Sequence, residues 1–267
     1  KPKKVKGVDI AVDNFLIDEH SGTDSTRFLY SKDISLHIPG FKTNLEGAPY
    51  TFSFKDLKFS SKNRDAQISK LSLQPTLSLE AFAKQDKLNK PRIELDLDST
   101  WITGINIQKL LADKLFEADS AHVVGGVFDL SKDKRYQLEN VSKVGQSPAQ
   151  QFMKVGLQFS VKAVKVSGID LGYAQISDKY FREGKIEFKN IWGTLKNVSN
   201  DTTVFRRNKI MTADLVGNIY GEGRLSAFFT FDMLSKAGNH SYKGGLTAMK
   251  VGAYNRILEP LLNIRLS

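Results

Sequence analysis

The sequence of 267 residues has no cysteine and only four histidines. The absence of cysteine excludes disulfides, thiolate nucleophiles and cysteine-ligated metal sites. The histidines lie far apart, and none forms a pair that would place two metal ligands on one helix face; they are His20, His37, His122 and His240. We therefore predict neither a metal nor any other cofactor.

Catalytic motifs are also missing. There is no Gly-x-Ser-x-Gly elbow, and Gly221-Glu222-Gly223 lacks the third glycine and the lysine of a phosphate-binding loop, so it indicates a hairpin turn. Glu94, Asp96 and Asp98 alternate with apolar residues, which is typical of a solvated strand face; a cation site is the alternative. The sequence predicts no catalytic residues and a protein that is not an enzyme.

No window of the sequence approaches the ~18 apolar residues that a membrane-spanning helix requires, and no signal peptide opens the chain. The sequence begins at Lys1-Pro2-Lys3-Lys4 without an initiator Met. We expect that targeting or anchoring segments belong to the full-length protein and are absent from this piece.

Basic residues exceed acidic residues by 39 to 29, which gives a formal net charge of +10. The lysines are scattered singly along the chain, as Lys162 and Lys165 are between Val161, Val164 and Val166. Without a basic stripe or a reader motif, the charge does not favour nucleic-acid binding. It indicates a solvated outer face, compatible with anionic lipid headgroups.

The dominant pattern is an alternation of apolar and polar residues, which predicts strands with one buried and one wet face. Short turns between the runs favour antiparallel meanders. Helices are predicted near 106–117, from Ser147 onward and over 254–264. The main alternating runs are Phe28 to Ile38, Tyr50 to Phe54, Leu71 to Leu79, Ile93 to Leu97, Val155 to Val161, Ile186 to Phe188, Met211 to Leu215 and Leu225 to Phe231.

One small pattern recurs at Asn14, Gly104 and Gly168, each of which stands between apolar residues after a strand pattern. Asn and Gly tolerate positive φ, so each is a candidate bulge that resets which face the next residue occupies. The pattern suggests degenerate copies of one β unit, although the spacings are too unequal for a strict solenoid; coincidence is the alternative.

Few helices are available to cover the apolar side of so many strands. The sheet either folds on itself as a sandwich or barrel, or stays open as a curved trough. Spacing alone favours the closed form. An open trough suits an acyl chain, because each buried methylene contributes about 0.8 kcal/mol.

The order of segments resembles the AsmA-like and TamB-like envelope proteins of Gram-negative bacteria, especially the uncharacterised AsmA-like proteins of the Bacteroidetes. The end of the chain carries most of the resemblance: a Phe-rich strand, a Gly-rich turn, a strand ending near Met249 and a short helix. The stretches that resemble the family are 28–34, 68–75, 133–135, 184–188, 197–200, 223–225, 242–246 and 255–261.

The resemblance implies an elongated, curved antiparallel sheet that forms a hydrophobic groove. It also implies a periplasmic body anchored in the inner membrane by an N-terminal helix, and a role in carrying phospholipids between membranes or in outer-membrane maintenance. The family offers no catalytic residues to carry over. This chain departs from the pattern by lacking the anchor and by stopping where the closing module would continue.

Together these observations predict a mainly β fold with a few short helices, divided into an N-terminal portion over 1–140 and a C-terminal portion over 141–267 that share one sheet. The predicted function is binding or conduction of phospholipid acyl chains. The alternative is a structural module of the envelope that binds protein partners without lipid. The predicted lining of the groove is Val155, Leu157, Phe159, Val161, Ile186, Phe188, Leu225, Ala227, Phe229 and Phe231.

Overall fold

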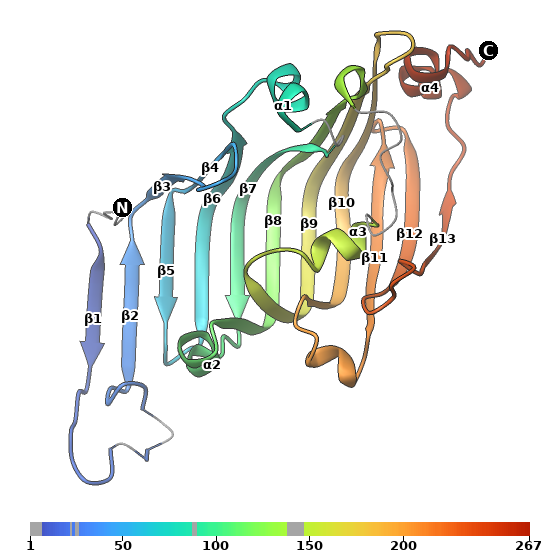
Figure 1. Cartoon of the computed structure of the whole chain (residues 1–267). Coiled ribbons are helices and arrows are strands. Elements are labelled where there is room, and N and C mark those ends of the chain that lie inside the picture. The colour runs from blue at the N-terminus through green and yellow to red at the C-terminus, as the bar shows by residue number, and fades with distance from the viewer. Residues whose placement is uncertain (1–6, 22, 25–26, 87–89, 138–146) are drawn as a thin grey trace.

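A computed structural model describes residues 7–21, 23–24, 27–86, 90–137 and 147–267. Within this part of the chain, one curved 13-stranded sheet forms the molecule, and short helices lie at its ends and over one face (Figure 1). The strands are β1 (Asp9–Asp13), β2 (Asp33–Ile38), β3 (Phe41–Asn44), β4 (Tyr50–Phe54), β5 (Asp56–Ser60), β6 (Asp65–Pro75), β7 (Arg92–Thr103), β8 (Leu115–Asp133), β9 (Gln158–Ile176), β10 (Glu183–Ser199), β11 (Ile210–Ile219), β12 (Gly223–Asp232) and β13 (His240–Leu246). The predicted mainly β fold with a long curved sheet is confirmed.

The strands follow one another across the sheet nearly in chain order, and the β3–β4 hairpin lies against β6. Neighbouring strands are antiparallel with one exception: β8 and β9 run parallel, pairing from Leu115↔Gln158 to Asp133↔Ile176. The prediction of an antiparallel sheet throughout is therefore wrong at this pair. A parallel pair requires a long crossover connection, and the chain makes it between Asp133 and Gln158.

The predicted boundary near residue 140 falls in this crossover. The sheet continues across it, because β8 and β9 pair along their whole lengths. The structure contains one sheet to which both portions contribute strands. The division of the chain into two portions stays a prediction.

Side chains that lie opposite each other in the register point to the same face of a sheet. From β1 to β13 this places apolar residues on one face, which we call the apolar face; Leu171, Phe188 and Ile219 are neighbours on it across β9, β10 and β11. Gly168 forms a bulge that lets apolar residues before and after it lie on the same face of β9. Its φ of 70° accompanies a break in register between Ser167 and Ile169. Val166 and Ile169 consequently share the apolar face. Asn14 and Gly104 also have positive φ, but they follow the ends of β1 and β7.

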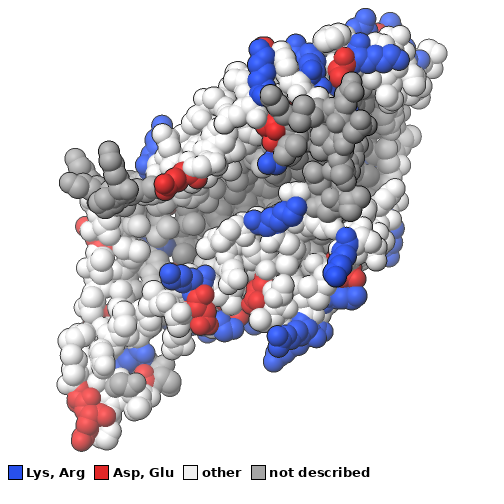
Figure 2. Space-filling model, in the orientation of Figure 1, with Lys and Arg blue, Asp and Glu red and all other residues white. Residues whose placement is uncertain are grey.

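The sheet does not close on itself: β1 and β13 each pair with one neighbour only in the described structure. The accessible surface area of 16538 Å² exceeds the about 11,700 Å² expected of a compact monomer of this mass. The closed sandwich that spacing alone favours is thus wrong, because strand twist and curvature, which the alternation does not encode, keep the ends apart. In Figure 2 the part of this hollowed side that grey atoms leave uncovered is largely white, and charged residues are frequent toward its rims.

The helices are shorter than the sequence predicts. The helix expected over 106–117 is α2 (Ile107–Ala112), capped by Asn106, and Leu115 already belongs to β8. α3 (Pro148–Phe152) begins at a capping box of Ser147 and Gln150, and α4 (Asn255–Leu262) follows a short 3₁₀ turn. α1 (Leu79–Asp86) is not predicted, since Leu77 and Leu79 continue an apparent alternation that in fact ends with β6 at Pro75.

Two small clusters hold about half of the buried apolar residues among those described. In the first, Ala149 of α3 and Phe205, from the connection between β10 and β11, pack with Met211 and Met233. The second gathers Ile105, Ala118 and Val161 where α2 covers β8 and β9. Much of the remaining apolar face is only half-buried, and the described residues form no second layer over it.

Candidate functional site

The apolar face carries a cavity of about 170 Å³ over β9–β12. None of the side chains around it can donate or accept a hydrogen bond. A space of this kind excludes polar ligands and favours hydrocarbon, because transfer of apolar surface out of water is favourable. Its lining is Leu171, Phe188, Ile191, Leu215, Val216, Gly217, Leu225, Ala227 and Phe229.

Four of the predicted lining residues, Phe188, Leu225, Ala227 and Phe229, surround this cavity. They come together because β11 lies between β10 and β12 and pairs with both. Phe229 stacks on Phe231 with ring centroids 6.1 Å apart. Their role in holding a lipid stays a prediction.

Other predicted lining residues lie on the same face but beneath helices. Phe231 packs against the α3 cluster, and the ring of Phe159 meets Phe152 edge-on at 5.1 Å. Val161 is buried among Ile105 and Ala118. Ile186 pairs with Tyr173 further along β10 and is half-buried.

Val155 and Leu157 are not part of a strand, so the alternating run predicted from Val155 is wrong at its start. β9 begins at Gln158, and both residues are exposed in the segment after α3, at 48% and 58%. Asn200 fixes this segment by donating hydrogen bonds from its side chain to the carbonyls of Val155 and Leu157, at 3.0 and 2.7 Å. The apparent alternation of apolar and polar residues therefore includes the end of the crossover as well as the start of β9.

The lining predicted from the sequence lacks the other five residues of this cavity, which are Leu171, Ile191, Leu215, Val216 and Gly217. Leu171 could have been found by continuing the alternation past Gly168, because the bulge preserves the face. Ile191 follows a second register shift between Phe188 and Ile191, which a count by twos does not pass. Gly217 has no side chain and leaves no hydropathy signal.

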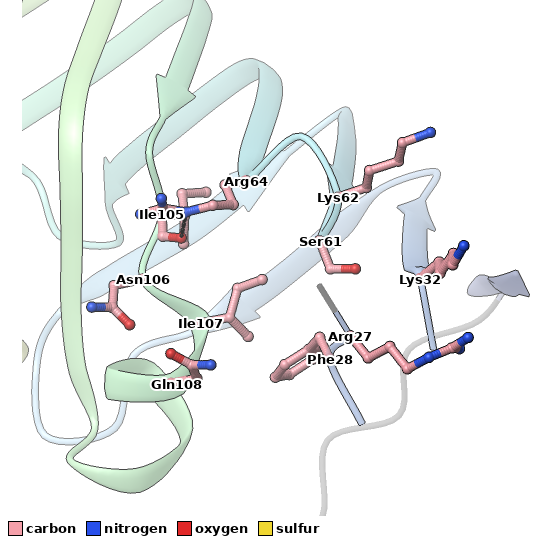
Figure 3. A pocket seen from close by; sticks show the side chains of 10 residues that line it. All are labelled: Arg27, Phe28, Lys32, Ser61, Lys62, Arg64, Ile105, Asn106, Ile107 and Gln108. Atoms are coloured by element: carbon pink, nitrogen blue, oxygen red, sulfur yellow. Dashed lines mark hydrogen bonds between the residues drawn. The ribbon is translucent and has the colours of Figure 1, made fainter. Parts of the chain in front are cut away.

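A second cavity, of about 750 Å³, lies at the lower edge of the sheet where the loops around residues 27–32, 61–64 and 105–108 meet (Figure 3). We call it the basic cavity because four of its lining residues are cationic and none is acidic. One wall carries Arg64 and the start of α2; the opposite wall carries the two lysines, Arg27 and Phe28 (Figure 3). Its lining is Arg27, Phe28, Lys32, Ser61, Lys62, Arg64, Ile105, Asn106, Ile107 and Gln108.

Asp33 organises the turn that carries Lys62. Its Oδ1 accepts hydrogen bonds from the backbone N–H of Lys62 at 3.0 Å and from the hydroxyls of Ser60 and Ser61 at 3.2 and 3.1 Å. Burial alone would raise the pKa of Asp33, but these donors outweigh it and hold the pKa below its usual value.

We therefore expect Asp33→Asn to lower the free energy of unfolding at neutral pH. In acid, the free energies of unfolding of the variant and the wild type should differ less. A carboxylate with a lowered folded-state pKa stabilises the fold above its unfolded-state pKa of about 3.9, and this contribution disappears as pH falls through the folded-state pKa. Urea midpoints at pH 7 and pH 3 measure the effect. A difference between wild type and variant that is equally large at both pH values would contradict the assignment.

Two of the histidines, His37 and His122, are held by other side chains. His37 lies between Asp56 and Asp9, with its ring nitrogens 2.6 and 3.4 Å from their carboxylates. His122 forms a hydrogen bond with Ser167 at 2.9 Å, a partner that the sequence did not indicate. Among the described residues, no three His, Asp or Glu side chains are grouped to hold a metal ion.

No helix in the described ranges combines the length and apolarity needed to cross a bilayer. No protein-family model matches the chain. No curated protein sequence matches it either.

Proposed function

We propose that this chain binds lipid by laying acyl chains along its apolar face. The observation that supports the proposal is an unclosed sheet whose apolar side chains stay half-buried over most of its length. Leaving such a face in water is unfavourable by roughly 25 cal/mol per Å², and an acyl chain removes that cost without requiring polar contacts. The cavity over β9–β12 marks the place where hydrocarbon fits best.

The proposal extends to setting and transport. The resemblance of segments 223–225, 242–246 and 255–261 to AsmA-like proteins supports a body in the periplasm of a Gram-negative bacterium, with the full-length protein anchored in the inner membrane. In that setting, a long apolar face serves non-enzymatic transport of phospholipids or outer-membrane maintenance. The lipid is the partner; nucleic acid is not part of the proposal.

The test is native mass spectrometry and lipid extraction of the purified protein. We expect bound species with the masses of membrane phospholipids, released by organic solvent. Protein that carries no lipid, and that takes up none from detergent-solubilised phospholipid, would overturn the proposal.

A second candidate function, an envelope module that binds proteins, is favoured by the two free edges of the sheet. β1 and β13 are exposed along their lengths and pair on one side only in the described structure. Such edges can accept a strand from a partner. The N–H of residue 242 points away from β12, whereas that of residue 243 points toward it. A partner captured by a photo-crosslinker at position 243 of lipid-free protein, whose capture a proline at position 242 abolishes, would support this function.

A further inference from the structure

We propose that the basic cavity binds the phosphate of an anionic lipid headgroup while the acyl chains lie on the adjoining apolar face. This inference rests on the proposed lipid binding and specifies the class of lipid. Its basis is a cavity that is lined by four cations and also by two isoleucines that belong to the core of the apolar face.

The charges in the cavity are not equivalent. The side chain of Arg27 is almost fully buried and its guanidinium already has partners. It forms an ion pair with Asp24 at 3.2 Å and donates hydrogen bonds to the carbonyls of Asn14 and Tyr30. It therefore supports the loop rather than serving as a free cation.

Arg64 is partly committed. Its Nε and Nη2 donate to the carbonyls of Ile105 and Gly104, both at 3.2 Å, which orients the guanidinium at the cavity wall. No hydrogen bond from its Nη1 occurs among the described residues, so this nitrogen can donate to a ligand. A guanidinium fixed in this way loses little conformational entropy when it binds an oxyanion.

Lys32 and Lys62 supply free charge. Both are exposed, and neither forms an ion pair with an acidic residue in the part of the chain that the structure describes. Two acids in or next to the same loops are engaged by other groups: Asp33 accepts a hydrogen bond from the backbone N–H of Lys62, and Asp24 forms an ion pair with Arg27. Figure 3 shows the side chains of Lys32 and Lys62 extending outward from one wall, while Arg64 lies against the other. Because a lysine ammonium stands on a flexible four-carbon stem, both lysines can turn toward an anion at the mouth of the cavity.

The apolar side of the cavity connects it to the sheet. Ile105 and Ile107 line the cavity and also pack in the cluster with Val161, Phe59 and Phe116 on the apolar face. A ligand whose phosphate meets the cations therefore has its hydrophobic part at the edge of this face. A soluble phosphate would interact only with the cations, whereas a phospholipid would also place its acyl chains on the apolar face.

The experiment compares three probes by native mass spectrometry and fluorescence competition: dilauroylphosphatidylglycerol, dilauroylglycerol with the same chains, and glycerol 3-phosphate. We expect wild-type protein to bind the phosphatidylglycerol best. The Lys32→Gln/Lys62→Gln variant should bind it about tenfold more weakly, which corresponds to losing one charge-assisted hydrogen bond, and should bind dilauroylglycerol as before.

The matched control is Lys165→Gln/Lys196→Gln, which removes the same charge from exposed lysines on the opposite face of β9 and β10. An equal loss in this control, or no loss in the cavity variant, would overturn the headgroup site. Glycerol 3-phosphate binding as tightly as the lipid would assign the cavity to a soluble phosphate instead. Failure of both lauroyl probes to bind would overturn lipid binding itself, so the two proposals fail separately.

Discussion

Phe229→Asp should abolish lipid binding and leave the sheet folded. Phe229 lines the cavity of the apolar face and is only half-buried, so a carboxylate there reaches water in the empty protein but is desolvated by an acyl chain. We expect the lipid-bound fraction to fall by about tenfold or more, since an unpaired charge against hydrocarbon costs several kcal/mol. Native mass spectrometry with a titrated phospholipid measures the loss.

The neighbouring residue provides the control. Phe228 lies on the other face of β12, where the ammonium of Lys243 stands 5.3 Å from its ring centre. Phe228→Asp should retain lipid, with a loss of about 0.2–1 kcal/mol in stability because Asp214 lies opposite it. Equal lipid binding by both variants, or unfolding of Phe229→Asp in circular dichroism, would show that Phe229 belongs to a structural core.

Phe205→Ala should reduce the free energy of unfolding by about 3–5 kcal/mol. Phe205 is 3% exposed and packs with Ala149 of α3, Met211 and Met233, so its removal leaves a cavity in the cluster beneath α3. Urea denaturation followed by circular dichroism gives the value.

The conservative variant separates packing from a general effect of mutation. Phe205→Leu keeps most of the apolar volume and should cost less than about 1.5 kcal/mol. A loss below 1 kcal/mol for the alanine variant would mean that α3 and its crossover contribute little to the fold. The sheet would then be stabilised by strand pairing and the second cluster alone.

Alternation predicted the strands and the face to which their residues point. The pattern from Leu225 to Phe231 is correct because β12 is regular along its whole length. It failed at Val155 and Leu157, where a loop imitates the period of a strand, and past Phe188, where a register shift moves Ile191 onto the apolar face. A hydropathy pattern follows the residues of one strand. It carries no information about bulges, in which one strand has an extra residue relative to its neighbour.

The basic cavity could not be predicted from the sequence. Arg27 stands in the loop before β2, whereas Lys62 and Arg64 stand in the turn between β5 and β6, and each resembles the many scattered cations of the chain. Only the placement of β2, β5 and β7 along one edge brings their loops together.

The sequence by itself determined that the chain forms strands, that most of them have one apolar face, and that helices are too few to cover that face. These properties follow from local periodicity and composition. The tertiary structure decided that the sheet stays open, that β8 and β9 pair in parallel through a crossover, and that α3 covers only part of the apolar face. Whether the sheet closes, and how much of its apolar face is covered, depends on strand twist and on contacts between residues far apart in the chain. No local pattern encodes these properties.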